Sequence, residues 1–452
     1  MRRALRRRNS GRRGRISQQT SIRNGPRVRG RDNRRAISAT WSDTWADLRA
    51  LDARQRNAIV ASYLGWTLDA FDFFLLVFVL KDIAAEFKTD VTAVSVAIVL
   101  TLAARPVGAL LFGLAADRWG RRPTLMVDII CYSAIELASG FAPSLTALLI
   151  LRTLYGVAMG GEWGVGASLT METIPPRTRG VVSGILQAGY PSGYLIASVV
   201  YGLLFTTIGW RGMFMVGAAP ALLVLYIRGK VDESPSFKAR RATLSGGSLW
   251  QTIRDNLGLF VFSIVLMTAF NFFSHGTQDL YPTFLQVQRH MTPHEVGVIA
   301  VVYNIGAIVG GISFGALSER IGRRLGIVIA ALIALPVIPL WVYAPNAIWL
   351  AVGAFLMQIA VQGAWGIVPA HLNELSPEDV RGTFPGFTYQ LGNLLASGNA
   401  TLQAAIASSY GNDYAFALAI VAAVVAVAVA LLAWFGVEAR GVKFAGTPQA
   451  AE

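Results

Sequence analysis

The sequence has 452 residues, of which 54% are hydrophobic and 15% are charged, with a formal net charge of +14. Soluble globular proteins contain about 25% charged residues, so this composition excludes a water-soluble globular domain. The sequence has no phosphate-binding glycine loop followed by Lys, no metal-spaced His/Cys cluster and no nucleophile triad. We therefore predict that the chain is not an enzyme and uses no cofactor or metal.

Residues 1–56 form a basic segment that we expect to be a disordered cytoplasmic tail. Residues 1–40 hold fourteen Arg and one Asp, so +13 of the net +14 lies there. The segment has few aromatic residues and no apolar periodicity, which favours a tail at an anionic membrane surface over a nucleic-acid-binding domain. It also lacks the short apolar stretch and small-residue cleavage site of a signal peptide.

Twelve apolar segments follow, each close to the ~20 residues that span a bilayer. They are 57–80, 91–116, 123–142, 144–171, 180–207, 210–228, 257–285, 295–317, 325–343, 346–372, 383–409 and 414–436. A polar stretch, 229–256, separates six segments from six. The sequence therefore predicts an all-α membrane protein with two six-helix halves, 57–228 and 257–437, a central cytoplasmic loop and a C-terminal tail, 438–452.

The loops predict the orientation, because Lys and Arg are enriched on the cytoplasmic side of membrane proteins. If the N-terminal tail is cytoplasmic, the later loops on that side and the C-terminus hold seventeen Lys or Arg, and the opposite loops hold four. We therefore expect both termini in the cytoplasm. Cys131, the single cysteine, excludes an intramolecular disulfide.

The first segment carries two acids, Asp69 and Asp72, one helical turn apart and hence on one face. Charges inside spanning helices are costly and usually face a cavity. Two carboxylates so close do not both ionise easily, which suits a proton carrier. The alternative for either residue is a hydrogen bond to a neighbouring helix.

The second segment contains Arg105, eight residues before Gly113 and therefore ~12 Å from the cytoplasmic loop. A guanidinium at this depth needs a carboxylate, either from a substrate or from the protein. Asp69, Asp72 and Glu162 are the candidate protein partners.

The third and fourth segments also carry charges. Asp128 and Glu136 in the third segment receive no role. Glu162 stands in a Gly-Gly-Glu-Trp-Gly run of the fourth segment, where glycines more often allow close helix packing than substrate contact. Pairing with a packed neighbour and proton relay are equally good interpretations of Glu162.

A ten-residue pattern after the second segment recurs after the eighth. Glycine there permits a tight turn, and the charges can engage helix ends across the cytoplasmic face, so we predict a gate. For any single Arg of the pattern, the alternative is that its positive charge only helps to set the orientation of the chain in the membrane. The gating residues are Gly113, Asp117, Arg118, Gly120, Arg121 and Arg122 in the first copy, and Glu319, Arg320, Arg323 and Arg324, between Gly315 and Gly322, in the second. Two copies in register resemble the loop signature of the major facilitator superfamily.

The seventh segment has a polar stripe on an otherwise apolar helix. Asn271, His275 and Asp279 recur every four residues, with Ser274 and Gln278 beside them. A stripe of this length favours a water-filled path over a single satisfied core histidine.

The string from Asn271 to Thr283 resembles the signature of the fungal lactate and pyruvate permeases, Asn-x-x-Ser/Thr-His-x-Ser/Thr-Gln-Asp-x-x-x-Thr, at all seven specified positions. Those permeases belong with bacterial sialic acid permeases in the sialate:proton symporter family. By the same resemblance, Gln390 and Asn393 look like the substrate-selecting pair of that family, and Arg105 looks like its essential arginine. The i, i+3 spacing independently puts the two amides on one helix face.

The resemblance implies a proton-coupled carrier of short monocarboxylates such as lactate or pyruvate. The expected substrate-binding residues are Arg105, Asn271, His275, Gln278, Gln390 and Asn393, and the expected proton-coupling residues are Asp69, Asp72, Glu162, His275 and Asp279. A symporter of sialic acid, an aromatic acid or a dicarboxylate is the main alternative, and a transporter-like sensor is a further one. We expect a monomer in a bacterial inner membrane whose partners are a small organic anion, protons and the lipid bilayer, with no nucleic acid.

Overall fold

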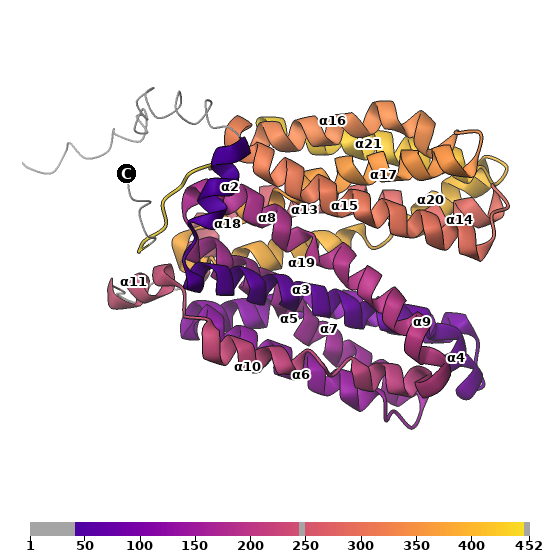
Figure 1. The fold of residues 1–452 in the computed structure, drawn as a ribbon, viewed down its shortest axis with the longest axis horizontal. Coiled ribbons are helices and arrows are strands. Elements are labelled where there is room, and N and C mark those ends of the chain that lie inside the picture. The colour runs from indigo at the N-terminus through magenta and orange to yellow at the C-terminus, as the bar shows by residue number, and fades with distance from the viewer. Residues whose placement is uncertain (1–40, 244–248, 447–452) are drawn as a thin grey trace, which may run out of the picture.

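The computed structural model describes residues 41–243 and 249–446, and every regular element in those ranges is helical (Figure 1). A short helix, α2 (Trp41–Arg49), precedes the first half. The first half contains α3 (Ala53–Phe78), α4 (Leu80–Glu86), α5 (Val91–Trp119), α6 (Arg121–Ser139), α7 (Leu145–Thr173), α8 (Arg179–Gln187), α9 (Gly189–Val216) and α10 (Ala221–Lys230). The single-turn helix η1 (Pro176–Thr178) lies between α7 and α8.

Helices α11 (Pro235–Thr243) and α12 (Leu249–Asp255) connect the halves. The second half contains α13 (Leu257–Gln278), α14 (Tyr281–Val287), α15 (Pro293–Ile321), α16 (Arg323–Val342), α17 (Ala347–Trp365), α18 (Val368–Leu375), η2 (Glu378–Val380), α19 (Phe384–Ala396), α20 (Asn399–Ser409) and α21 (Tyr414–Phe435). In Figure 1 the indigo-to-magenta helices form one lobe and the orange-to-yellow helices form the other.

The predicted fold class is confirmed, because each of the twelve apolar segments is occupied by one helix or by two consecutive helices. Eight helical stretches in the described ranges are long and apolar enough to cross a membrane. The other four segments are the third and fourth, formed by α6 and α7, which carry buried charges, and the sixth and eleventh, which are interrupted. The sixth is interrupted just before α10, and the eleventh is divided between α19 and α20. The fifth segment, which is one of the eight, ends before Gly209, whose φ of 63° breaks the helix.

Glycine makes the sharp turns within the repeated ten-residue pattern. Gly120 joins α5 to α6 with φ of 115°, and Gly322 joins α15 to α16 with φ of 98°. Both angles lie where a side chain is rarely accommodated, so one residue suffices to reverse the chain between two spanning helices. The two halves therefore share the same connection at the same place.

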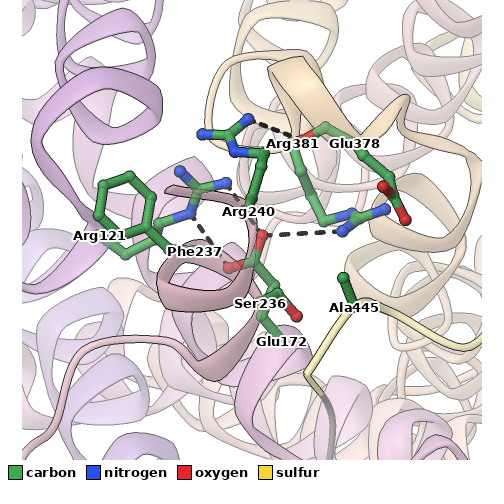
Figure 2. Close-up of a pocket in the computed structure, with 8 residues that line it drawn as sticks. All are labelled: Arg121, Glu172, Ser236, Phe237, Arg240, Glu378, Arg381 and Ala445. Carbon is green, nitrogen blue, oxygen red and sulfur yellow. Dashed lines mark hydrogen bonds and ion pairs between the residues drawn. The ribbon is translucent and has the colours of Figure 1, made fainter. Parts of the chain in front are cut away.

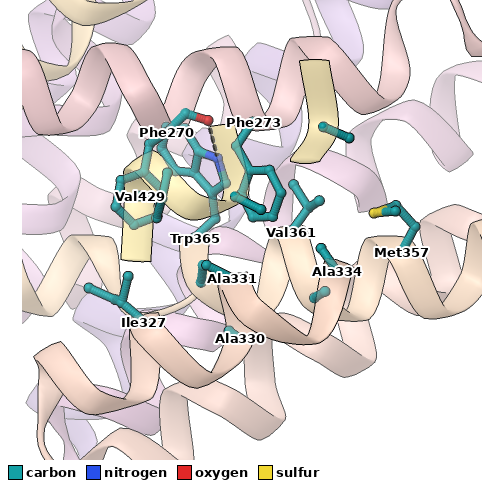
Figure 3. Packing of buried hydrophobic residues seen from close by; sticks show 14 of the residues in the cluster. Phe270, Phe273, Ile327, Ala330, Ala331, Ala334, Met357, Val361, Trp365 and Val429 are labelled. Carbon is teal, nitrogen blue, oxygen red and sulfur yellow. Dashed lines mark hydrogen bonds between the residues drawn. The ribbon is translucent and has the colours of Figure 1, made fainter. Parts of the chain in front are cut away.

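Close backbone contacts hold the helices of each half together. A Cβ atom at Gly156 would lie 2.2 Å from the carbonyl oxygen of Thr101, and one at Gly160 would lie 2.1 Å from that of Arg105, so α7 packs directly on α5. Gly306 and Gly310 place α15 equally close to α17. Small residues serve this purpose in membrane helices, where packing replaces the hydrophobic effect. Figure 3 shows the second-half core, in which Phe270 and Trp365 meet at the centre.

The prediction of a disordered tail is wrong for residues 41–56, while residues 1–40 lie outside the described residues. Helix α2 is held there because Leu48 packs against a buried cluster that contains Met171, Val181 and Phe444, and Leu51, which follows the helix, is 5% exposed. Asp52 then caps α3, since its side chain accepts a hydrogen bond from the N–H of Gln55. Isolated apolar residues within a charged stretch gave no periodic signal for this helix.

Candidate functional site

A buried arginine lies near the middle of the first half. Arg105 is 4% exposed, and its Nη2 atom lies 3.6 Å from Oδ2 of Asp69, which is fully buried. Nε and Nη2 of Arg105 and both carboxylate oxygens of Asp69 make no hydrogen bond within the described residues. The pair is therefore an ion pair without hydrogen bonds, and its donors remain available to another anion.

Asp72 and Glu162 lie in the same interior. Both are fully buried, and neither carboxylate has a hydrogen-bond partner among the described residues. Glu162 fits against α3 only because residue 65 is glycine, since a Cβ there would lie 2.2 Å from Oε1 of Glu162. The structure thus brings three predicted proton-coupling acids of α3 and α7 into one half.

Two further acids, which the sequence analysis left without a role, complete this cluster. Arg152 donates from Nη2 to Oε2 of Glu136 (2.6 Å) and to the hydroxyl of Ser139 (2.6 Å). Asp128 is fully buried without a hydrogen-bond partner in the part of the chain that the structure describes. The signal was present in the sequence as two acids in an apolar segment.

The first-half cluster has more acids than bases. Its members are Asp69, Asp72, Asp128, Glu136 and Glu162 against Arg105 and Arg152. An isolated ionised carboxylate is very costly in a low-dielectric interior, so acids without a cationic partner are neutralised by protons. This excess of carboxylates gives the first half a capacity to hold protons.

The polar stripe of α13 faces α19. His275 Nδ1 lies 3.1 Å from Oδ2 of Asp279, and Nε2 lies 2.9 Å from Oδ1 of Asn393. The imidazole therefore links the carboxylate to the amide across two helices. Asp279 and His275 are both partly exposed, so protons can reach them.

Gln390 lies next to Asn393, as the sequence predicted. Asn393 Nδ2 lies 3.5 Å from Oε1 of Gln390, while Nε2 of Gln390 is buried and donates no hydrogen bond within the described ranges. A buried donor without a partner is costly and indicates a missing acceptor. The side-chain amide of Asn271, in contrast, donates to the carbonyl of Met267 in its own helix (2.7 Å).

Two residues of α17 that the sequence analysis missed also contact the stripe. Gln358 accepts from Nε2 of Gln278 (3.0 Å), and Gln362 donates to the hydroxyl of Ser274 (3.4 Å). Amides in an otherwise apolar helix are the signal that could have identified them.

Aromatic side chains join the two halves at the level of these groups. The ring of Tyr389 on α19 lies 4.8 Å from that of Trp163 on α7 and 5.4 Å from that of Trp365 on α17. Tyr389 therefore contacts one tryptophan from each half.

The repeated pattern joins the two halves to each other. Asp117 accepts from the N–H groups of Gly382 (2.8 Å) and Thr383 (2.9 Å), directly before α19. Glu319 accepts from the N–H of Gly180 at the start of α8. Each half thus places a carboxylate on a helix N-terminus of the other half, where the helix dipole favours an anion. Gly113 permits the approach, since a Cβ there would lie 2.6 Å from Cα of Thr383.

A second pair of contacts follows the same symmetry. Arg121 donates two hydrogen bonds to Glu172 (2.9 and 3.2 Å), and Arg323 donates two to Glu374 (2.9 and 3.0 Å). Glu374 is therefore a buried partner of an arginine. Figure 2 shows Arg121 and Arg381 reaching Glu172 from opposite halves.

The remaining arginines of the pattern differ from these. Arg118 is exposed, whereas Arg122 donates through its backbone N–H to Glu233 and through its side chain to the carbonyl of Arg228. Arg324 donates through its backbone N–H to Glu438, and the carbonyl of Arg320 accepts from Arg440.

The C-terminal segment 438–446 lies across this contact between the halves. Phe444 is 3% exposed, and its ring centre lies 3.6 Å from the guanidinium carbon of Arg179 and 3.8 Å from that of Arg381. Arg179 is the first residue of α8 in the first half, and Arg381 follows η2 and precedes α19 in the second half. The aromatic ring thus separates two like charges and attracts both.

Comparisons with known proteins agree with this architecture. The sequence model of the Major Facilitator Superfamily matches residues 62–292 and 264–450. A carboxylic acid transporter protein homolog of Saccharomyces cerevisiae is 30% identical over 390 residues, which cover 80% of this chain and 63% of the relative, so the match spans less than two thirds of that protein. A probable 4-methylmuconolactone transporter of Cupriavidus pinatubonensis is 31% identical over 80% of this chain and 86% of its own length.

The proton:xylose symporter XylE is a similar solved structure. It aligns with a TM-score of 0.69 over 87% of this chain and 98% of its own length, at 19% identity. At that identity the likeness concerns the fold alone.

The Arg152–Glu136 pair predicts a stability effect. Arg152→Leu leaves the Glu136 carboxylate buried without its cation, and we expect a loss of about 3–5 kcal/mol in the free energy of unfolding. The double variant Arg152→Leu/Glu136→Leu should recover most of this loss, because no uncompensated charge remains. Thermal denaturation of the purified variants measures the loss and the recovery of stability. A double variant as unstable as Arg152→Leu would contradict the interpretation that an unpaired buried charge causes the loss.

Proposed function

The chain belongs to the Major Facilitator Superfamily, and we propose that it carries short monocarboxylates such as lactate and pyruvate across a membrane together with protons. It is a transporter and not an enzyme. The match of the Asn271–Thr283 string to the lactate and pyruvate permease signature supports the substrate class.

The observation that carries the proposal is the state of Arg105. This guanidinium is buried with unused donors, and Asp69, the carboxylate within 4 Å of it among the described residues, stands at 3.6 Å without a hydrogen bond. A planar guanidinium binds a carboxylate through two parallel hydrogen bonds, which Asp69 does not form. A substrate carboxylate that forms them would displace Asp69.

This displacement supplies the coupling. When the substrate anion occupies Arg105, Asp69 loses its cation in a low-dielectric interior and takes up a proton. When the substrate leaves, Asp69 returns to Arg105 and releases the proton. One proton accompanies one monocarboxylate, so no net charge moves and the pH gradient contributes ~1.4 kcal/mol per pH unit.

The second half supplies neutral groups for selection. Gln390 offers its unpaired amide N–H, and the His275–Asn393 contact places an imidazole and an amide beside it. Neutral donors and acceptors distinguish the hydroxyl or keto group next to the carboxylate by hydrogen bonding. We therefore assign anion binding to Arg105 and discrimination among acids to Gln390 and Asn393.

Alternating access completes the proposal. The carboxylate contacts of Asp117 and Glu319 close the cytoplasmic side, and their loss allows the halves to rock apart on that side. Because each contact is a few hydrogen bonds at a helix N-terminus, the closed state is stabilised without being irreversible.

A second candidate substrate is a ring-containing or unsaturated acid. The stacked pair Trp66 and Tyr190 and the contacts of Tyr389 with two tryptophans provide aromatic surface near Arg105. Flat acids pack well against such rings. The 4-methylmuconolactone transporter among the relatives also favours this candidate.

Arg105→Lys tests the anion site. The variant keeps the charge but loses the planar fork, so we expect the half-saturating lactate concentration to rise at least about tenfold. The half-saturating concentration is measured by uptake into proteoliposomes under an imposed pH gradient. Radiolabelled lactate, pyruvate, benzoate and sialic acid, tested in the same way, rank the substrates. Lactate uptake with wild-type affinity in this variant would make Arg105 a structural residue.

Asp69→Asn tests the coupling. The amide cannot titrate and no longer holds Arg105, so we expect lactate counterflow to persist while accumulation driven by the pH gradient is lost. Asp279→Asn is the matched comparison, because His275 and Asp279 form the rival proton site. If Asp69→Asn accumulates lactate normally and Asp279→Asn does not, the proton travels through α13.

Phe444→Ala tests the cytoplasmic closure. Removing the ring leaves Arg179 and Arg381 facing each other, which destabilises the closed state by about 1 kcal/mol, or about fivefold in the open population. With Cys131 replaced by Ala, a cysteine at the buried position Ala370 reports opening through its rate of maleimide labelling. The exposed Phe435 provides the control variant Phe435→Ala, and equal rates in the two variants would remove Phe444 from the closure.

A further inference from the structure

The hydroxyl of Ser274 differs from its neighbours on α13. Thr268 and Thr277 donate to the carbonyls of Ile264 (2.8 Å) and Phe273 (2.9 Å), each four residues earlier in the helix. Such bonds are the usual local partner of a hydroxyl inside a helix. Ser274 donates no hydrogen bond within the described residues, although it stands in the middle of the polar stripe.

A tryptophan donates a hydrogen bond to the carbonyl oxygen that the Ser274 hydroxyl would otherwise use as its acceptor. The indole Nε1 of Trp365 donates to the carbonyl oxygen of Phe270, four residues before Ser274, at 3.1 Å (Figure 3). This contact crosses from α17 to α13 and is buried. It therefore competes with the bond that Ser274 would make to its own helix.

Two amides occupy the acceptor positions of the same hydroxyl. The oxygen of Ser274 accepts from Nε2 of Gln278 (3.2 Å) and from Nε2 of Gln362 (3.4 Å). A hydroxyl has two acceptor lone pairs and one hydrogen, so these contacts use its acceptor capacity and leave only its hydrogen. The hydroxyl is arranged as a donor to something outside the helix.

One face of α17 produces this arrangement. Gln358, Gln362 and Trp365 follow one another at i, i+4 and i+7, and all three are buried. Gln358 also holds Gln278 in place, by accepting from its Nε2 at 3.0 Å. If this face of α17 served only to pack, apolar side chains would fill it without the free-energy cost of desolvating amides. The two glutamines therefore serve to hydrogen-bond the polar stripe of α13.

We propose that Gln362 and Trp365 are positioning residues that keep the Ser274 hydroxyl free to donate a hydrogen bond to the transported acid. The inference rests on the proposed function, because it concerns the same binding site. It adds Ser274 as a hydrogen-bond donor to the substrate. It also means that residues of α17 influence the affinity for the substrate indirectly, through their contacts with α13.

A double-mutant cycle tests the proposal. Gln362→Leu removes one of the two amides that orient the Ser274 oxygen, so its hydroxyl hydrogen is no longer directed out of the helix, and we expect the dissociation constant of the acid to rise about tenfold. Ser274→Ala should have the same effect, and the double variant should be no weaker than Ser274→Ala alone. Trp365→Phe keeps the ring but removes the N–H, and it should also weaken binding. Isothermal calorimetry of the purified full chain with lactate, pyruvate, benzoate and sialic acid measures these constants.

Gln403→Leu is the matched control. Gln403 is a fully buried glutamine of α20 that donates to the backbone carbonyl of Gly276 (2.7 Å), away from the stripe. Its loss should lower the melting temperature and leave the dissociation constant unchanged.

The outcomes separate this inference from the proposed function. If the wild-type chain binds none of the four acids, the proposed function fails and this inference fails with it. If the wild type binds an acid but the losses in Gln362→Leu and Ser274→Ala add independently, the inference alone is wrong. Unchanged binding in Ser274→Ala or in Trp365→Phe would also overturn it.

Discussion

The fold depends on the constraint that a charge buried among apolar helices must find a partner of opposite charge or lose its charge. Arg105 satisfies this constraint incompletely, because its contact with Asp69 is an ion pair at 3.6 Å without hydrogen bonds. Arg152 satisfies it more completely, because its Nη2 donates to Glu136 and Ser139, although its Nε has no hydrogen-bond partner within the described residues. The two arginines lie in the same half at similar burial, and this difference supports the proposal that Arg105 binds the substrate anion while Arg152 is structural.

Two equivalent contacts join the halves at the repeated pattern. Asp117 and Glu319 each leave their own half to reach a helix N-terminus of the other. In the proposed mechanism these contacts close one side of the transporter, and both separate when the halves rock apart. Phe444 contacts Arg179 and Arg381, which belong to different halves, so the C-terminal segment bridges the halves at the same place.

The sequence predicts the contacts that are local and leaves open those that depend on distant parts of the chain. Apolar character over about 20 residues predicts the twelve segments, and i, i+4 spacing predicts the His275–Asp279 pair. The contact of His275 with Asn393 joins residues 118 positions apart, and only resemblance to a family suggested their common role. The burial of Phe444 could not be predicted, because a single aromatic residue in a polar tail carries no periodic signal. Asp128 and Glu136 were visible as charges, but their partners come from other helices.

The two halves differ in chemistry, and this difference explains how specificity and coupling can vary separately. The first half contributes ionisable groups with more acids than bases, while amides, hydroxyls and one imidazole predominate on the facing side of the second half. In the proposed mechanism the carboxylate of the substrate exchanges with Asp69 at Arg105, a step that is the same for every monocarboxylate. Hydrogen bonds from Gln390, Asn393 and Ser274 reach the remainder of the molecule, which differs between acids. Substitutions among the amides therefore change which acid is bound without altering the charge balance that couples its movement to a proton.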